Sequence, residues 1–279
     1  MSTALTREQG DLRDAVADLM AKRSPESEVR RLMAGETGYD PAVWAELAAM
    51  GLLGLTIPEE FGGAGAGAAE LAVVSEQIGR ALLCAPYLST AVLTPYLLVA
   101  LDDTTECADV LPRIAAGTLL TAVAFAEAGS ARPPRHPETA AVESSGAWRL
   151  TGEKTYVLDA GAAERLYVLA HTDSGTAVFA VERDAPGVTV TALTTIDATR
   201  RQGRITLSDA PARLIGAPGA GTAALQEALD RAAVALVAEQ AGGALHAQQM
   251  ATDYARTRYQ FGRAIGSFQA VKHMCVDML

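Results

Sequence analysis

The residues best suited to bind an anion lie near the end of the 279-residue chain. Arg258 precedes Gln260, Phe261 and Gly262 in a short turn, and Gln269 follows a few positions later. The planar donors of an arginine match the oxygens of a phosphate or pyrophosphate. The same side chain could equally be a solvated cation near a helix C-terminus, where positive charge is favourable. The spacing therefore indicates either a pyrophosphate-binding group or a charged helix end.

The elements that must position this segment begin with helices, from residue 1 to about residue 118. Thr6 can cap a first helix, and Asp40 followed by Pro41 is a second start signal. The Pro- and Gly-rich segment 55–65 reads as a loop that is not helical. Apolar spacing predicts further helices over residues 42–50, 68–83, 90–100 and 105–116.

The pattern changes to short β-type runs at about Leu119, and helices return after Gly221. A small antiparallel sheet domain or barrel is expected from runs at 119–125, 148–151, 166–171, 177–181, 188–192 and 204–207. A long helix is expected over residues 222–259, with a second beginning near Ser267. The sequence thus predicts an α+β fold with a helical domain over 1–118, a β domain over 119–218 and a partial helical domain over 219–279.

Composition excludes several classes of partner. The formal net charge of −10 argues against a nucleic-acid partner, which would require clustered Lys and Arg. No apolar run is long enough to predict a membrane span. The three cysteines are scattered, which fits reduced thiols in a cytoplasmic protein and predicts no metal site. Gln269, His273 and Asp277 share one helical face, a pattern more typical of surface or interface hydrogen bonds than of a metal site.

Several motifs occur in the order typical of one enzyme family. They are Ile57-Pro-Glu-Glu-Phe-Gly-Gly, the segment from Leu111 to Gly117, Leu150-Thr-Gly-Glu-Lys-Thr-Tyr-Val, Asp197-Ala-Thr-Arg, and the C-terminal turn. On these motifs the chain resembles the FAD-dependent acyl-CoA dehydrogenase family. The resemblance implies a helical N-terminal domain, a β middle domain and a C-terminal helical bundle that is incomplete in this chain.

The resemblance also implies a reaction and its partners. In the family an acyl-CoA thioester lies against FAD, a Glu removes the α-proton, and the β-hydrogen leaves as hydride to flavin N5. Family members act in fatty-acid and lipid metabolism, form dimers or tetramers, and imply an electron-transfer acceptor protein. An acyl-CoA oxidase or related flavin oxygenase on the same fold is a further alternative.

The resemblance assigns flavin contacts to two separate segments. The C-terminal half of the flavin site consists of Arg258, Gln260, Phe261, Gly262 and Gln269. In the family this half serves a flavin bound mainly by the neighbouring subunit.

The sheet half of the flavin site consists of Phe125, Ala126, Tyr156 and Leu158. Tyr156 can stack over the flavin ring. Ala126 and Leu158 stand where the family has threonines, so two hydroxyl contacts are missing, on the order of 0.5–1.5 kcal/mol each.

No residue is a firm candidate for the catalytic base. Family members usually place the Glu beyond the point where this chain ends, or at a helix position that corresponds here to Ala232. Glu239, two turns along the same face, is a weak candidate. The alternative hypothesis is a catalytically degenerate partner subunit in a hetero-oligomer, contributing to a flavin site in another subunit. Arg132, Arg135 and His136 are either exposed loop charges or contacts for a CoA phosphate.

Overall fold

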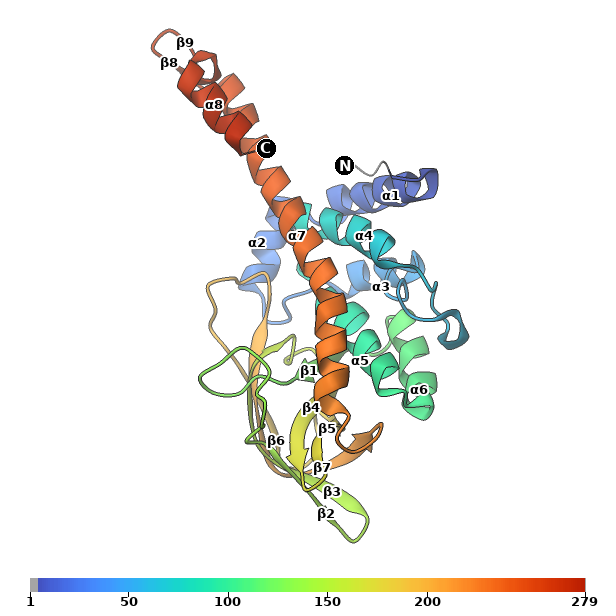
Figure 1. Ribbon diagram of the computed structural model, residues 1–279. Coiled ribbons are helices and arrows are strands. Elements are labelled where there is room, and N and C mark those ends of the chain that lie inside the picture. Colours follow the sequence, from blue (N-terminus) through green and yellow to red (C-terminus); the bar gives the residue numbers. More distant parts are fainter. Residues whose placement is uncertain (1–4, 279) are drawn as a thin grey trace.

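The protein begins with a layer of helices, followed by a β domain and a long C-terminal helix (Figure 1). The computed structural model describes residues 5–278. The helical segments of the first layer are α1 (Arg7–Arg23), α2 (Glu26–Ala34), α3 (Pro41–Ala49), η1 (Glu59–Phe61), α4 (Ala68–Arg80), η2 (Tyr87–Leu93), α5 (Thr94–Leu101) and α6 (Thr104–Ala115). The mixed α+β fold predicted from the sequence is confirmed.

The helix start signals act as predicted. The Thr6 hydroxyl accepts a hydrogen bond from the Gln9 N–H, and the Gln9 side-chain oxygen accepts one from the Thr6 N–H. The Asp40 carboxylate accepts from the Ala42 N–H, with Pro41 at the first helical position. Both starts are local patterns, which explains why the sequence alone predicts them.

Three features of this layer differ from the sequence-based expectation. Helix α2 was not predicted, and the loop over 55–65 contains the single 3₁₀ turn η1. The helix expected from residue 90 begins earlier, as the π-helical segment η2, in which the Thr94 hydroxyl donates to the Ser89 carbonyl at 3.0 Å. A π-helical turn inside a helix often marks a functional region.

The β domain is a largely antiparallel sheet that closes on itself. Its strands are β1 (Thr121–Ala124), β2 (Ala140–Ser144), β3 (Ala147–Leu158), β4 (Arg165–Thr172), β5 (Gly175–Glu182), β6 (Val188–Ala192) and β7 (Gln202–Ile215). Pairings β2–β3, β3–β7, β7–β5 and β5–β4 are antiparallel, and β4 meets β2 through His171 opposite Ala140. The antiparallel sheet expected from the sequence is present in these pairings, whereas β1 and β2 run parallel to β4. Strand β2 was not predicted.

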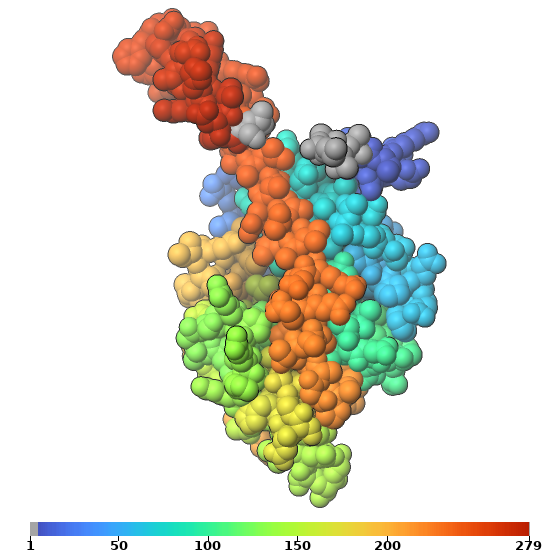
Figure 2. Space-filling view, viewed as in Figure 1, coloured from blue at the N-terminus to red at the C-terminus, as the bar shows by residue number. Residues whose placement is uncertain are grey.

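The chain then forms one long helix that extends beyond the rest of the molecule. Helix α7 (Gly221–Thr257) is followed by β8 (Tyr259–Gln260), β9 (Arg263–Ala264), η3 (Ile265–Ser267) and α8 (Gln269–Asp277). Figure 2 shows this terminal segment projecting from the body, at the end of α7 away from the β domain. Helix α8 has no buried residue, whereas α7 buries Ala224, Ala228, Ala232 and Ala235. Within residues 5–278, none of the helices combines the length and apolar character that crossing a membrane requires.

Of the three hydrophobic clusters among the described residues, the two larger ones hold these parts together. One lies inside the β domain and includes Leu150, Phe179 and Ile205. The other joins the N-terminal helices to α7 and to strands such as β4, through Tyr167. Beside it, Glu106 of α6 accepts hydrogen bonds from Tyr167 at 2.7 Å and from Arg165 and Arg213. The β domain is therefore anchored to the helices by apolar packing and by a buried carboxylate.

Helices α4 and α7 cross in direct backbone contact, and this contact sets where α7 lies. A Cβ at Gly242 would lie 1.9 Å from the Glu76 carbonyl oxygen. A Cβ at Gly243 would meet nothing closer than 3.6 Å. The two neighbouring glycines therefore differ sharply in their tolerance of a side chain.

We expect Gly242→Ala to lower the free energy of unfolding by about 1–3 kcal/mol through overpacking. Gly243→Ala is the matched control and should raise it by roughly 0.5–1 kcal/mol, because alanine favours the helix. Urea unfolding of both variants checks this. Equal effects of the two substitutions would contradict the close crossing.

Candidate functional site

The C-terminal half of the predicted flavin site forms a tight hairpin at the end of α7. Phe261 and Gly262 are its central residues, with φ of 54° and 76° between β8 and β9. Positive φ at both central positions is typical of the turn that joins two antiparallel strands. A phenylalanine rarely adopts positive φ. Phe261 does so here while it is 90% exposed, so burial of its ring does not stabilise the turn. The turn therefore holds a large aromatic ring on the exposed surface of the hairpin.

Arg258 and Gln269 lie at the two ends of this hairpin segment. The Arg258 carbonyl accepts a hydrogen bond from the Ile265 N–H at 2.8 Å, which closes the segment. Asp253, earlier on α7, pairs with Arg256, and the Arg258 side chain is exposed. The Gln269 amide contacts the His273 ring at 2.9 Å. The structure thus brings the five predicted C-terminal residues onto one exposed segment.

A stacked group of side chains stabilises the hairpin. The Phe268 ring meets the Phe261 ring edge-on at 6.2 Å between centroids. The Arg263 guanidinium lies 4.0 Å from the centre of the Phe268 ring, in a cation–π contact. These contacts leave Arg258 as an exposed cation suited to a phosphate.

The sheet half of the predicted site lies at the end of β3. Tyr156 has φ of 53° at a bulge between β3 and β7, and its side chain is 46% exposed. The Thr155 N–H donates to the Ala126 carbonyl at 2.9 Å, which joins this strand end to the segment after β1. Phe125 packs against the core of the helical domain. Ala126 is buried, and Leu158 is partly buried.

A buried ion pair that the sequence reasoning missed supports this half. Lys154 is fully buried and donates to the Glu127 carboxylate at 2.6 Å. Glu127 also accepts from the Thr139 hydroxyl at 2.8 Å and from the backbone N–H groups of Glu138 and Thr139. Although burial opposes it, the Lys154 hydrogen bond and the backbone donors lower the pKa of Glu127. The signal was available, because Lys154 has the inward register of Leu150 on β3.

Asp159, which follows directly on Leu158, was also missed. It accepts a hydrogen bond from Ser89 of η2 at 2.6 Å. Arg200, from the loop before β7, pairs with Glu239 of α7 beside it. The weak candidate for the catalytic base, Glu239, is thus ion-paired within its own chain and its side chain is 25% exposed.

The two predicted halves lie at different levels along α7. The sheet half is next to Glu239, because Asp159 and Arg200 meet α7 there. Arg258 lies 258 − 239 = 19 residues further along, or about 28 Å along a helix axis at 1.5 Å per residue. Figure 1 shows the hairpin at the end of α7 that points away from the β domain. One chain therefore does not bring its own halves together.

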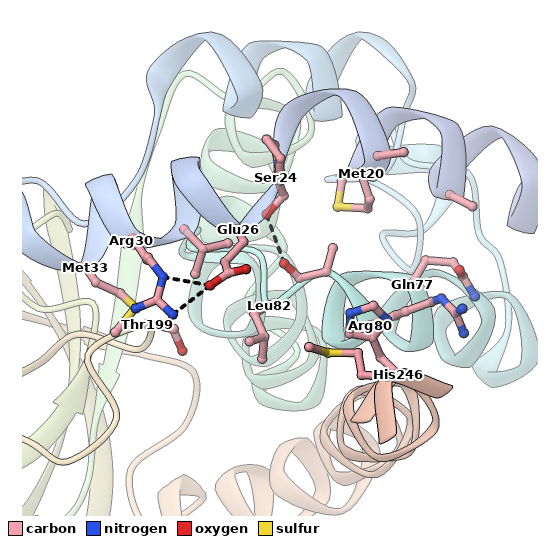
Figure 3. Close-up of a pocket in the computed structure, with 16 residues that line it drawn as sticks. Met20, Ser24, Glu26, Arg30, Met33, Gln77, Arg80, Leu82, Thr199 and His246 are labelled. Atoms are coloured by element: carbon pink, nitrogen blue, oxygen red, sulfur yellow. Dashed lines mark hydrogen bonds and ion pairs between the residues drawn. The ribbon is translucent and has the colours of Figure 1, made fainter. Parts of the chain in front are cut away.

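A cavity of about 650 Å³ lies between α1, α2, α4 and α7 (Figure 3). Its apolar lining includes Met20, Val29, Leu82 and Met250, with Arg30, Arg80 and His246 among its polar members. Arg30 and Glu26 form an ion pair at its edge, and the Ser24 hydroxyl donates to the carbonyl of Ala81, the residue that follows α4, at 3.1 Å (Figure 3). None of the predicted flavin residues lines this cavity.

The remaining candidates lie on the surface. Arg132, Arg135 and His136 are exposed in the loop between β1 and β2. Within the described residues, no group of three or more His, Cys, Asp or Glu is placed to hold a metal ion. The Gln269–His273 contact accounts for two of the three polar residues on one face of α8.

Comparison with known proteins identifies the family. Models of the acyl-CoA dehydrogenase N-terminal, middle and C-terminal domains match residues 6–118, 122–210 and 219–279. The chain belongs to the acyl-CoA dehydrogenase family, whose members are FAD-binding oxidoreductases that act on CH–CH groups. The family resemblance inferred from the motifs is confirmed.

Several individual proteins are similar to the chain. The acyl-CoA dehydrogenase IpdE2 of Mycobacterium tuberculosis is 32% identical, over 96% of this chain and 70% of that protein. The solved ChsE4-ChsE5 complex from Mycobacterium tuberculosis is 31% identical, with a TM-score of 0.88 over 99% of this chain and 74% of the matched one. The solved structure of the Tcur3481-Tcur3483 steroid ACAD G363A variant is 33% identical, with a TM-score of 0.84 over 97% of this chain and 72% of the matched one.

The residues present fit a flavin. An exposed arginine and an exposed aromatic ring on the hairpin suit a pyrophosphate and an adenosine, and the half-exposed Tyr156 ring suits the isoalloxazine. Ala126 and Leu158 themselves carry no side-chain hydroxyl. The individual flavin contacts remain predictions.

Proposed function

We propose that this chain is a subunit of an FAD-dependent acyl-CoA dehydrogenase in which each flavin lies between two subunits. The reaction is α,β-desaturation of an acyl-CoA thioester, and the bound flavin supplies the hydride acceptor at N5. The observation that carries the proposal is the separation of the two half-sites along α7, about 28 Å along the axis. An exposed hairpin far from its own sheet half is suited to a flavin seated in a neighbour.

In this proposal the residues of the chain divide the work. Arg258 pairs with the pyrophosphate, and the exposed Phe261 and Gln269 contact the same cofactor from across the interface. Tyr156 covers the ring at the end of β3. Backbone donors at Ala126 and Leu158 replace the hydroxyls of related enzymes and polarise the reacting groups.

A second candidate is a catalytically degenerate partner that completes the flavin site of a different subunit. Two observations favour it. Ala126 and Leu158 weaken the sheet half, whereas the C-terminal half is intact. The ChsE4-ChsE5 complex, one of the similar structures, contains two named proteins.

The likeness to a steroid ACAD also favours a substrate class. We propose a bulky, steroid-derived acyl-CoA as the first thioester to test, with straight-chain acyl-CoAs as the comparison. An electron-transfer acceptor protein is the proposed physiological oxidant, and an artificial acceptor replaces it in the assay.

The test is to purify the chain alone and co-expressed with a dehydrogenase-like protein from a neighbouring gene, and to count flavins per chain. Bleaching of the flavin near 450 nm by a thioester, with turnover only when an artificial acceptor is present, is the expected result. One flavin per chain in the isolated homo-oligomer would sink the partner candidate. A flavin that no thioester reduces in either preparation would contradict the proposed reaction, and fast turnover with oxygen alone would indicate an oxidase.

A further inference from the structure

The flavin-facing end of β3 is tied to the helical domain by the residue that follows it. Ser89 of η2 donates a hydrogen bond to Oδ2 of Asp159 at 2.6 Å. The Asp159 N–H donates to the Arg201 carbonyl at 2.9 Å, and its own carbonyl accepts from the Ala162 N–H at 2.9 Å. Asp159 is therefore fixed on its side chain and on both sides of its backbone.

This fixation holds a strained backbone. Tyr156 and Asp159 both have positive φ, of 53° and 54°, on either side of Val157 and Leu158. Positive φ is uncommon for a tyrosine and persists only where the surroundings impose it. The direction of the Tyr156 ring thus depends on how firmly the strand end is held.

The charged groups around Asp159 come from two neighbouring elements. Arg200, in the loop before β7, attracts the carboxylate, and Glu239 of α7 repels it. Burial raises the pKa of Asp159 to about 6, while Ser89 and Arg200 act in the opposite direction. The Asp159 carboxyl group therefore changes its charge near pH 6.

We propose that Asp159 is a positioning residue whose ionised carboxylate, held by Ser89 and facing Arg200, orients the Tyr156–Leu158 segment toward the flavin. The inference rests on the proposed function, because it assumes that Tyr156 and Leu158 meet the flavin ring. Asp159 is not among the predicted flavin contacts, so its role would be exerted through its neighbours. Ser89 and the π-helical segment η2 serve the same role from the helical domain.

The first expected result concerns the pH dependence of FAD binding by the purified assembly. Above pH 6 the carboxylate accepts the Ser89 hydrogen bond and is attracted by Arg200, and below pH 6 protonation removes its charge. We expect FAD affinity to fall about tenfold as the pH is lowered from 8 to 5, since a hydrogen bond to a charged group is worth roughly a factor of ten. Flavin fluorescence quenching measures this without catalysis.

Asp159→Asn keeps the shape and removes the titration. This variant should bind FAD about tenfold more weakly than the wild type at pH 8 and show no inflection near pH 6. Ser89→Ala should weaken binding at pH 8 in the same direction. Asp209→Asn is the matched control, because Asp209 also has positive φ, of 53°, but its side chain is 79% exposed. The pH dependence of FAD binding by Asp209→Asn should equal that of the wild type.

The stability of the apoprotein separates positioning from a structural role. The raised pKa in the folded state means that the neutral form stabilises the fold, and that this stabilisation is lost as the pH rises through about 6. Asp159→Asn removes the buried charge, so it should raise the apoprotein Tm at pH 8 while it weakens FAD binding. If Asp159 had a structural role alone, Asp159→Asn would lower the apoprotein Tm and the FAD affinity together.

Each outcome decides the inference. A flat pH profile in the wild type, or loss of both Tm and FAD affinity in Asp159→Asn, overturns it. Wild-type protein that binds no FAD at any pH overturns the proposed function, and this inference with it. Binding with the expected pH profile, but without reduction by any thioester, supports the inference and contradicts only the proposed reaction.

Discussion

Replacing Lys154 with methionine should lower the free energy of unfolding by about 3–5 kcal/mol, because it leaves the Glu127 carboxylate buried without its cation. Lys154 is fully buried and its partner's side chain is 9% exposed. Burial alone lowers the pKa of Lys154, and the Glu127 pair opposes that shift. Removing one partner of this pair should therefore lower the free energy of unfolding by far more than the intact pair contributes to it. Urea unfolding at pH 7 measures the loss.

A surface ion pair that joins β3 to β7 is the matched control. Arg204 and Glu153 lie 3.4 Å apart, with side chains 48% and 44% exposed. Arg204→Met should cost only about 0–1 kcal/mol. The double variant Lys154→Met with Glu127→Gln should recover part of the loss, because no charge is then left unpaired. A loss for Lys154→Met no larger than that of Arg204→Met would show that the pair is not enclosed as described.

Arg258→Ala should weaken FAD binding roughly 10- to 100-fold, the amount expected when a charge-assisted hydrogen bond to a phosphate is lost. The side chain is exposed and lies on the projecting hairpin, so the Tm of the apoprotein should stay unchanged. Equilibrium titration with FAD, followed by quenching of flavin fluorescence, gives the affinity.

Arg256→Ala is the matched control for this substitution. Arg256 lies on the same last turn of α7 and is also exposed, but it pairs with Asp253 at 3.3 Å. Its removal should leave FAD affinity within a factor of two or so, as for other surface ion pairs. If both substitutions weaken FAD binding equally, the effect is one of general charge and the assignment of Arg258 is wrong.

The parts of the fold that could be predicted from the sequence depend on local patterns. The cap at Thr6 and the start at Asp40–Pro41 involve residues a few positions apart, and they give correct helix starts. Helix α2 was missed, since its N-cap is Pro25 and no side chain caps it. The parallel pairing of β1 with β4 joins Thr121 to Arg165, and no local pattern encodes a contact over that separation.

The candidate site follows the same division. Arg258, Phe261, Gly262 and Gln269 could be selected because their motif is continuous and folds as one hairpin. The residues that support the sheet half come from distant segments. Glu127 is hydrogen-bonded to Lys154, 27 positions away in the sequence, and Ser89 to Asp159, 70 positions away. Their pairing depends on the closed sheet and on the packing of η2 against it.

Sedimentation of the FAD-loaded protein tests whether each flavin lies between two chains. Sedimentation velocity recorded at 280 nm and near 450 nm follows the chain and the flavin in the same experiment. As the protein is diluted, we expect flavin absorbance to move only with species of two or more chains, and flavin to be released as the assembly dissociates. Flavin that sediments with a single chain of 29.0 kDa would contradict it.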